Sequence, residues 1–417
     1  MISKFKHLFK KTNIQLKPVE FEQGSDTIVF SGIIYHNDYI NICHDTCSIC
    51  YNKDGSWRNL DDRRTYIENK IKVGHESILQ HSVVLIQISM EKSDNNLEFI
   101  YKNIATAFDG VRNKHLLYYI KNTDKSIDVY VKGSILAIKN YIRYSHITDN
   151  LIYKGIKNSL YELDKCVLWD FIRDNILSDF KFIPNYEANI ETYQNEFKPL
   201  YQGKYIDLLG SNENYIISLC LDLDLPNVET LEISSVTVLF KRIPRVISQM
   251  VTRHDNAITQ LSQRYTDCSD TEFIVPADIK DEEIMEVNIN GETKQLSALE
   301  LGNFICNFYK QLLEKGYRKE QARAYLPNNI NTQLYVTFTL KNLIHFLQLR
   351  THKSAQIDIV VIAKEIEKAS KDVFGSWIDY DLIKPVYEVM GQQLEEKLDI
   401  DEPMGRVKEE IECMKKE

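Results

Sequence analysis

The feature that most constrains the fold of this chain is the stretch from Gln249 to Tyr265, where a helix-like segment leads into a polar segment. Pro244 suits the first turn of a helix, because its fixed backbone angle is already helical. Side chains that favour one helix face then recur at helical spacing: Val246 or Ile247, Met250, Val251 and His254. Gln249 and Arg253 would flank this apolar seam.

Ser262 and Arg264 form a candidate anion site just beyond this helix. Residues two apart in an extended or irregular segment can point to the same side of the chain. A hydroxyl and a guanidinium on one side can hold a single phosphate group, because both donate hydrogen bonds to its oxygens. So short a motif also matches by chance, and its meaning depends on the rest of the chain.

Strand-like and helix-like segments recur along the sequence. Residues 82–88 are apolar and rich in β-branched side chains, as expected of a strand buried on both faces. Residues 231–240 are another strand candidate, and residues 332–340 alternate like a half-buried strand. Helical spacing follows at residues 341–350 and again at 354–370.

Arg350 is a charge on an apolar helix face. Leu343, Phe346, Leu347 and Arg350 stand at positions i, i+3, i+4 and i+7 of one predicted helix. A guanidinium buried there is costly unless it is paired. We therefore expect Arg350 either to meet a carboxylate or to face a polar pocket.

Two local motifs predict further elements. Residues 281–293 are acidic and contain Asn290 and Gly291, which indicates an exposed turn or hairpin. Ser297, with Glu300 three residues later, is a capping box that begins a long helix, and Gly316 ends it. This helix carries apolar side chains that we expect to form a core face: Leu299, Phe304, Phe308, Leu312 and Leu313.

Cys43, Cys47 and Cys50, with His44 beside them, invite a zinc interpretation. The three cysteines nevertheless fall on one helical face, and no second pair of ligands completes a site of four. His75 and His81 stand six apart, which matches no standard metal site. We predict core packing for the cysteines and no metal.

Composition narrows the classes of function. The chain has 417 residues, enough for two or three domains or for one domain with a large insertion. A net charge of -9 argues against a general nucleic-acid or membrane-surface binder, whereas a small anionic ligand needs only a local basic pocket. No signal-like N-terminus, no long apolar run and only 8 cysteines predict a cytoplasmic protein.

The middle of the chain, residues 91–230, carries no recognisable chemistry and is interpreted as an inserted subdomain, mainly helical. Lys139 and Arg143 are most simply solvated helix charges. The tail at 391–417 is charge-dense and is expected to be a solvated helix or partly disordered.

Three separated segments together resemble the flavin-dependent thymidylate synthases. They are residues 74–81 (GHESILQH), residues 249–265 (QMVTRHDNAITQLSQRY), and residues 320–358, which contain EQARAYLP and LIHFLQLR. The spacing of Pro327, Thr332, Arg350 and Gln356 is also that of the family. The resemblance covers roughly residues 40–90 and 231–370.

The resemblance implies an α/β (α+β) fold in which a mixed sheet is flanked by helices. The discontinuous catalytic core would be residues 1–90 and 231–390, interrupted by the insertion. It also implies reductive methylation of dUMP at C5, with methylenetetrahydrofolate as the methylene donor, FAD as cofactor and NADPH as reductant. Such a protein would be a homotetramer that acts on a nucleotide and binds neither nucleic acid nor membrane.

The resemblance also implies roles for individual residues. The phosphate of dUMP would be held by Ser262 and Arg264, with Arg323 and Arg350 contacting the nucleotide and Arg350 polarising the uracil as the catalytic residue. Further nucleotide contacts would come from Gln249 and Gln260. The positions implied near the flavin are His75, Ser77, Arg253, His254 and His345.

The residues that depart from the family pattern stand at positions that the resemblance places near the flavin, whereas the nucleotide contacts are kept. The family reads Arg-His-Arg where the ungapped register places Thr252, Arg253 and His254. Shifting by one residue aligns Arg253 and His254 but leaves Asp255 in third place. In addition, Thr339 stands for an asparagine and Gln80 for a glutamate.

These departures keep other functions open. One is a C5 hydroxymethylase, or a synthase that acts on another pyrimidine nucleotide. Another is a non-catalytic protein that binds nucleotides on the same scaffold, with the insertion making new partner contacts.

Overall fold

The structure is a computed structural model that describes residues 28–36, 39–51, 59–108, 116–145, 147, 149–161, 199–209, 227–254, 256–280 and 283–375. The predicted charged tail at 391–417 and Asp255 lie outside the described residues. The chain packs as two compact units. The first comprises residues 1–198, 210–235 and 257–259, and the second comprises residues 199–209, 236–256 and 260–417.

The first unit contains a four-stranded sheet in the order β1-β2-β4-β3. Its strands are β1 (Ile28–His36), β2 (Val84–Glu91), β3 (Leu116–Asn122) and β4 (Ser126–Gly133), all paired antiparallel. The strand predicted at residues 82–88 is thus β2, and its Val84, Leu85 and Ile86 are fully buried. The expectation of a strand buried on both faces is confirmed.

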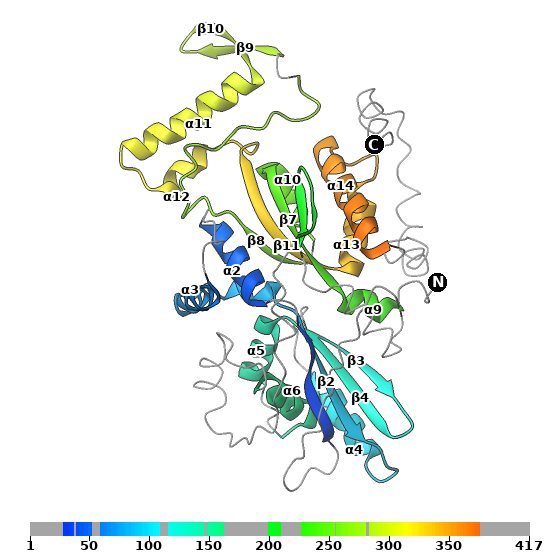
Figure 1. The fold of residues 1–417 in the computed structure, drawn as a ribbon. Helices are drawn as coiled ribbons and strands as arrows, with labels where there is room; N and C mark the ends of the chain where they lie inside the picture. The colour runs from blue at the N-terminus through cyan, green and yellow to red at the C-terminus, as the bar shows by residue number, and fades with distance from the viewer. Residues whose placement is uncertain are drawn as a thin grey trace. The chain divides into compact units, whose positions relative to one another are not determined.

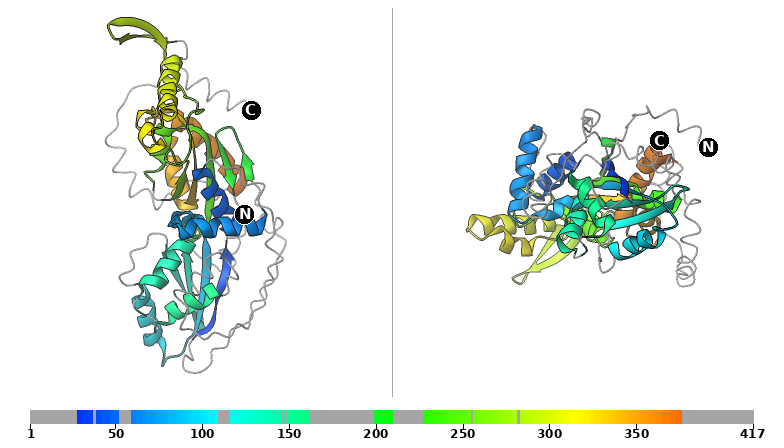
Figure 2. Two further views of the ribbon diagram at one scale, coloured as in Figure 1. Left: turned by 90° about the vertical axis from the view of Figure 1, so that its left-hand side faces the viewer. Right: turned by 90° about the horizontal axis from the view of Figure 1, so that it is seen from below.

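Helices of the first unit pack on this sheet and on one another (Figures 1 and 2). They are α4 (Leu97–Ala107), α5 (Ile135–Tyr144) and α6 (Leu151–Tyr161), with α9 (Asn227–Ile233) later in the chain. Among the described residues of 91–230, strands and helices both occur, and β4 pairs with β2. Packing does not show whether residues 91–230 are inserted into an older domain. The predicted boundaries at 90 and 231 therefore stay a prediction.

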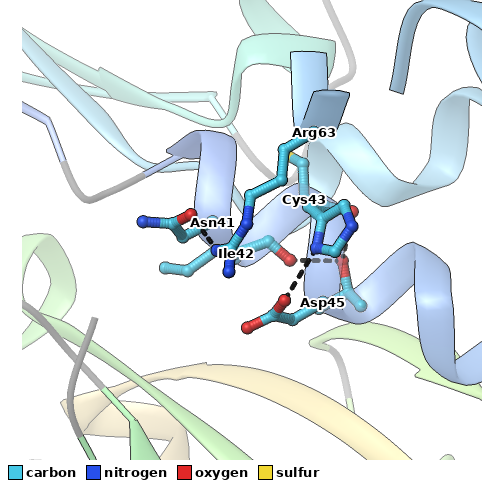
Figure 3. A network of polar contacts seen from close by, with 7 residues as sticks. Asn41, Ile42, Cys43, Asp45 and Arg63 are labelled. Carbon is cyan, nitrogen blue, oxygen red and sulfur yellow. Dashed lines mark hydrogen bonds and ion pairs between the residues drawn. The ribbon is translucent and has the colours of Figure 1, made fainter. Parts of the chain in front are cut away.

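Two helices lie between β1 and β2 in the chain: α2 (Tyr39–Cys50) and α3 (Leu60–Lys72). Figure 3 shows Arg63 of α3 donating a hydrogen bond to Asn41 of α2. It also shows the hydrogen bond between Asp45 and the ring of the neighbouring His44. Cys43, Cys47 and Cys50 are all buried, as one helical face predicts. Within the part of the chain that the structure describes, no group of three metal-ligating side chains is found.

Lys139 of α5 corrects an expectation. Its side chain is fully buried rather than solvated, and its Nζ lies 2.5 Å from Oε1 of Glu76. Arg143, on the same helix, is exposed as predicted. The reason is periodicity: Ile135, Ile138 and Ile142 define the buried face of α5, and Lys139 falls on that face.

The second unit is built on a sheet in which β5 (Pro199–Gln202), β6 (Ile206–Leu209), β7 (Ser235–Pro244) and β11 (Asn331–Thr339) are neighbours in that order. The β5–β6 and β6–β7 pairs are antiparallel. Thr237 of β7 and Thr337 of β11 join their hydroxyls at 2.7 Å in the interior. The strand predicted at 332–340 is β11. The strand predicted at 231–240 is present as β7 but begins only at Ser235, because residues 231–233 belong to the helix α9. Strand β8 (Ala257–Gln260) follows α10.

Helices of the second unit flank this sheet, so the α+β class is confirmed. They are α10 (Arg245–Val251), α13 (Leu340–Arg350) and α14 (Ile357–Phe374), with the short α12 (Lys319–Ala322) and the 3-10 turn η3 (Arg323–Tyr325) before β11. Figure 1 shows α13 and α14 packed against each other. In the described part of the chain, no helix is both long enough and apolar enough to cross a membrane.

The hairpin and the long helix predicted after it are both present. Strands β9 (Ile284–Ile289) and β10 (Glu292–Ser297) are joined by Asn290 and Gly291, both with positive φ. Helix α11 (Ala298–Glu314) opens on the complete Ser297–Glu300 capping box. Figure 2 shows the hairpin at the end of α11.

The predicted core face of α11 is wrong in part. Phe304 is 58% exposed, Phe308 42% and Leu299 39%. The buried positions are instead Gly302, Cys306 and Tyr309, while Leu312 and Leu313 are partly buried against the Tyr309 cluster. Apolar side chains on two sides of the helix made the sequence ambiguous, and only one side faces the unit's interior.

Candidate functional site

His254, His345 and Arg350 meet in the second unit, where α10 ends and α13 ends. Nε and Nη2 of Arg350 each lie 3.3 Å from Nε2 of His254. The rings of His254 and His345 are 5.9 Å apart between centroids, and Phe346 lies at 5.1 Å from His254, both edge-on. The sequence placed all three residues in one site, and the structure brings them into contact.

The hydrogen bonds of Arg350 leave one edge of its guanidinium open. Nε and Nη2 donate to His254, and Nη2 also donates to the Met250 carbonyl at 3.4 Å. Within the described residues, no carboxylate pairs with Arg350 and Nη1 has no partner. Of the two predicted surroundings of Arg350, the one without a carboxylate therefore fits the described residues.

Both histidines beside Arg350 are held neutral. Burial lowers the pKa of His254 to about 4, with further lowering by the charge of Arg350 and by His345. Burial and Arg350 also lower the pKa of His345. Because an arginine can only donate, Nε2 of neutral His254 must accept, which puts the ring proton on Nδ1. The cluster thus carries its positive charge on the guanidinium alone.

Burial lowers the pKa of Arg350 as well, and the neighbouring charge of Arg253 adds to this. Arg253 itself is exposed and follows the end of α10. Thr252, which stands at the first position of the altered triplet, is the C-cap of α10, and its hydroxyl donates to the Gln249 carbonyl at 3.1 Å. The Gln249 side chain is exposed.

Gln260 is tied to the framework of the second unit. Its Nε2 donates to Ser248 Oγ at 2.8 Å and to Thr332 Oγ1 at 3.2 Å. Both hydroxyls are buried, so the amide links α10 to β11. These bonds show a structural role, and the predicted contact with a nucleotide stays a prediction.

Ser262 and Arg264 lie in the turn after β8. Ser262 is half-buried and its Oγ accepts a hydrogen bond from the Arg264 amide at 3.3 Å. Arg264 is exposed, with its guanidinium carbon 5.6 Å from the Tyr265 ring centroid. Within the described residues, no hydrogen bond or ion pair joins this turn to Arg350.

Arg323 opens η3 and is half-buried. Its charge lowers the pKa of Arg245, the first residue of α10, although burial is the larger cause. Nη1 of Arg245 is buried without a hydrogen-bond partner among the described residues. The sequence does not identify Arg245 as a candidate site residue. The only signal is its place directly after Pro244, because a helix-start motif does not by itself require an arginine there.

His75 and Ser77 belong to the first unit. His75 is the N-cap of η1 (Glu76–His81), half-buried, with Nδ1 3.9 Å from the Cys47 sulfur. Burial, and then the charge of Lys70, lower its pKa. Ser77 is exposed in η1. Further along, His81 Nε2 lies 2.8 Å from Thr259 Oγ1, and both residues are buried. The predicted hydrogen-bonding role of His81 is thus confirmed.

Thr339, which stands where the family has an asparagine, has a local structural role. Thr339 is the N-cap of α13, and its Oγ1 accepts from the Asn342 amide at 3.1 Å. Asparagine and threonine both cap helices well, so the substitution keeps the start of the helix that carries His345 and Arg350.

The second unit thus has an α+β fold with a candidate site for a nucleotide. Arg245 begins α10, Arg253 follows its end, and the histidines lie beside Arg350 of α13. Residues 193–374 match the family model described as thymidylate synthase complementing protein. Over this segment, the chain is similar to the flavin-dependent thymidylate synthases. Residues 74–81 lie outside the matched segment, so their resemblance stays a prediction.

Curated relatives agree with the family model. The flavin-dependent thymidylate synthase of Saccharolobus solfataricus is 34% identical over 143 residues, which is 34% of this chain and 52% of that protein. The enzyme of the same name from Geobacter sulfurreducens is 31% identical over 155 residues, covering 36% and 62%. The chain spans about half the length of the curated relatives it matches.

One solved structure is similar at a lower level. A UMP/dUMP methylase, PolB from Streptomyces cacaoi bound with 5-Br UMP, aligns with a TM-score of 0.27 and 20% identity. The alignment covers 39% of this chain and 77% of that one. Likeness at this level says nothing further about what this chain binds.

The described residues of the second unit fit a flavin. Asn256 has a buried Nδ2 without a partner among the described residues, while its Oδ1 accepts from Asn342 of α13 at 3.3 Å. Unused donors suit the acceptor-rich edge of an isoalloxazine ring. Neutral His345 and His254 can accept or donate beside such a ring without adding charge.

Proposed function

We propose that this protein is a flavin-dependent thymidylate synthase that methylates dUMP reductively at C5. Methylenetetrahydrofolate would donate the methylene group, FAD would be the cofactor and NADPH the reductant. The observation that carries the proposal is the half-buried Arg350, which has an open Nη1 edge and no carboxylate partner among the described residues. The match of residues 193–374 to the family model supports it.

The chemistry needs a cation at the pyrimidine. C5 of uracil is a poor nucleophile, and it becomes a better one when negative charge is drawn toward the ring oxygens. The guanidinium of Arg350, aimed by His254 and by the Met250 carbonyl, stabilises that charge as it develops. A bound flavin, held by Arg253, His254 and His345, would supply the hydride that completes the methyl group, because no side chain is a hydride donor.

The neutral histidines keep this cation effective. A protonated His254 would repel Arg350 and could no longer accept its hydrogen bond, so the guanidinium would turn. With a pKa near 4, His254 stays neutral across the physiological range. Its ring then orients Arg350, and Phe346 packed on the ring excludes water from that side.

Binding of the nucleotide is assigned to polar groups of the second unit. Ser262 and Arg264 would hold the phosphate, with Gln249, Gln260 and Arg323 as further contacts. His75 and Ser77 of the first unit, with Arg253, His254 and His345, would contact the flavin. We further propose that the protein is a homo-oligomer, since Phe304, Phe308 and Leu299 leave an apolar side of α11 exposed.

A non-catalytic function is the second candidate. It is favoured by the altered triplet, since Thr252 serves as a helix cap and Arg253 is exposed in the structure. Such a protein would bind dUMP without flavin and without turnover. Two alternative reactions would use the same Arg350. Hydroxymethylation at C5 differs in the product, and action on another pyrimidine nucleotide differs in the substrate.

The test is release of tritium from 5-labelled dUMP by the purified protein with FAD, NADPH and the folate. We expect flavin absorbance and tritium release from the wild type. Arg350→Lys should reduce the rate about 100-fold or more, because a point charge cannot reproduce the oriented fork. Exposed His352→Gln, just beyond α13, is the control and should match the wild type. A colourless wild-type protein that releases no tritium with added FAD would refute the proposal.

A further inference from the structure

Strand β3 forms one edge of the sheet in the first unit (Figure 1). It pairs with β4 on one side, and among the described residues no strand lies on its other side. At the opposite edge, β1 carries two register shifts and packs against α6. Bulges and covering helices protect edge strands from pairing with another chain. β3, by contrast, pairs without a register shift along all of Leu116–Asn122.

The backbone groups of β3 point alternately toward β4 and away from it. Just beyond the strand, the Thr123 amide donates to the Ser126 carbonyl at 2.9 Å, so this pair is hydrogen-bonded. In an antiparallel ladder, every second residue turns its amide and carbonyl to the partner strand. Tyr119 therefore bonds to β4, whereas the backbone groups of Tyr118 and Ile120 point outward. Within the part of the chain that the structure describes, no hydrogen bond is made to these outward groups.

The side chains at the outward positions form an apolar surface together with α4. Tyr118 is 43% exposed and Ile120 is 44% exposed. Phe108, which follows α4, stacks on the Tyr118 ring at 4.2 Å between centroids. Tyr101 of α4 is 44% exposed, and its hydroxyl accepts from Asn122 at 3.4 Å. A regular strand edge with exposed apolar side chains favours pairing with another strand.

The sequence of β3 is self-complementary about Tyr119. When two copies pair antiparallel across a two-fold axis at this residue, Tyr118 of one copy lies opposite Ile120 of the other. An aromatic side chain opposite a β-branched one is a favourable cross-strand pair. Lys121, the charged residue of the strand, falls opposite Leu117 and not opposite its own counterpart. The strand therefore fits a second copy of itself.

Charges on the other face of β3 match in the same pairing. The Tyr119 hydroxyl donates to Oε2 of Glu232 in α9 at 2.9 Å, which places a carboxylate beside the strand. Lys121 of a second copy would stand diagonal to Tyr119, within reach of that carboxylate. The pairing thus brings opposite charges together on this face and apolar side chains together on the α4 face.

We propose that β3 is a dimer interface, at which two copies of this chain join their four-stranded sheets into one continuous sheet across a two-fold axis at Tyr119. About eight backbone hydrogen bonds form, because every second residue turns outward and each facing pair exchanges both bonds. The strand lies outside residues 193–374, which match the family model. The inference does not depend on the proposed function.

The experiment measures the mass of the full chain by analytical ultracentrifugation over a range of protein concentrations. The first test variant combines Tyr118→Lys with Ile120→Lys, which sets like charges opposite each other in the paired strands. The second is Ile120→Pro, which removes an outward amide but no hydrogen bond to β4. Phe99→Lys is the control, since Phe99 is 52% exposed and, two residues from Tyr101, faces another side of α4.

We expect both test variants to have half the mass of the wild type at equal concentration, with the dissociation constant of the pair raised about tenfold or more. Phe99→Lys should keep the wild-type mass. Tyr119→Cys should form an intermolecular disulfide with oxidised glutathione that the wild type does not form. The reason is that the two copies of this residue face each other as a non-hydrogen-bonded pair, about 4.5 Å apart between Cα atoms.

Assembly through another face gives different results. If copies meet only through α11, both test variants keep the wild-type mass and the inference is overturned. A wild type that stays monomeric at every concentration, or an equal loss of mass in Phe99→Lys, would also overturn it. The disulfide of Tyr119→Cys leaves Tyr118 and Ile120 intact, so it decides the question if both test variants misfold; its absence would overturn the pairing. Turnover of dUMP tests the proposed function separately.

Discussion

His254 shows how one residue's environment sets the state of the site. The folded chain protonates His254 only near pH 4, whereas an ordinary histidine does so near 6.5. Between these values the unfolded chain holds more protons than the folded one, so stability rises with pH across this window. Below it, His254 becomes charged beside Arg350 and the hydrogen bond between them is lost.

A prediction at the residue scale follows from this rise of stability with pH. His254→Gln should flatten the increase in unfolding free energy between about pH 4 and 6.5, removing about 1–2 kcal/mol once partial exposure is allowed for. Some slope should remain, because the pKa of His345 is lowered too. Urea unfolding at a series of pH values measures this, with His352→Gln as the exposed control. A slope in His254→Gln equal to the wild type would contradict the assignment.

At the residue scale, helical spacing predicts which charged side chains are buried. Arg350 was predicted on a buried helix face and is half-buried there. Lys139 has the same kind of spacing within α5, but the expectation of a solvated charge ignores that spacing, and the side chain is fully buried. Arg245 could not be predicted, because its significance comes from Arg323 far along the chain.

At the scale of elements, α5 holds the start of the 74–81 segment in place. The buried Lys139 ammonium is paired with Glu76, which is the second residue after Gly74 and directly follows His75. Ser82 Oγ accepts from the Ile135 amide at 3.0 Å, a second link to α5. A helix from the middle of the chain thereby positions the residues that the family resemblance places near the flavin.

We predict that Lys139→Met destabilises the protein by about 1–3 kcal/mol. Breaking a buried pair leaves Glu76 without its partner, although partial exposure lets water hydrate that carboxylate. Hydrogen exchange of the amides of η1 should become faster in the variant. Arg143→Met, on the exposed side of the same helix, is the control; if both variants unfold at the same urea concentration, Lys139 has no such role.

Elements with complete local motifs were the predictable ones. The capping box at Ser297 and the Asn290–Gly291 turn need only nearby residues, and both are present. The burial of α11 was predicted wrongly, because which of two apolar sides turns inward depends on the unit that packs against it. Local signals fix where an element begins, while its orientation is set by tertiary packing.

At the scale of the whole molecule, two compact units divide the proposed site residues. His75 and Ser77 belong to the first unit, and the other predicted residues belong to the second. The family model covers residues 193–374, which include the described core of the second unit. Length and composition allowed several domains, but long-range packing, which decides the units, leaves no local pattern in the sequence.

The most direct test of this account is a crystal structure of the protein grown with dUMP and FAD. We predict one bound nucleotide with Arg350 at its pyrimidine oxygens and with Ser262, Arg264 and Arg323 around it, from one copy or from neighbouring copies. The exposed side of α11 should pack against a second copy. A nucleotide bound away from Arg350, or no nucleotide at saturating dUMP, would contradict the account.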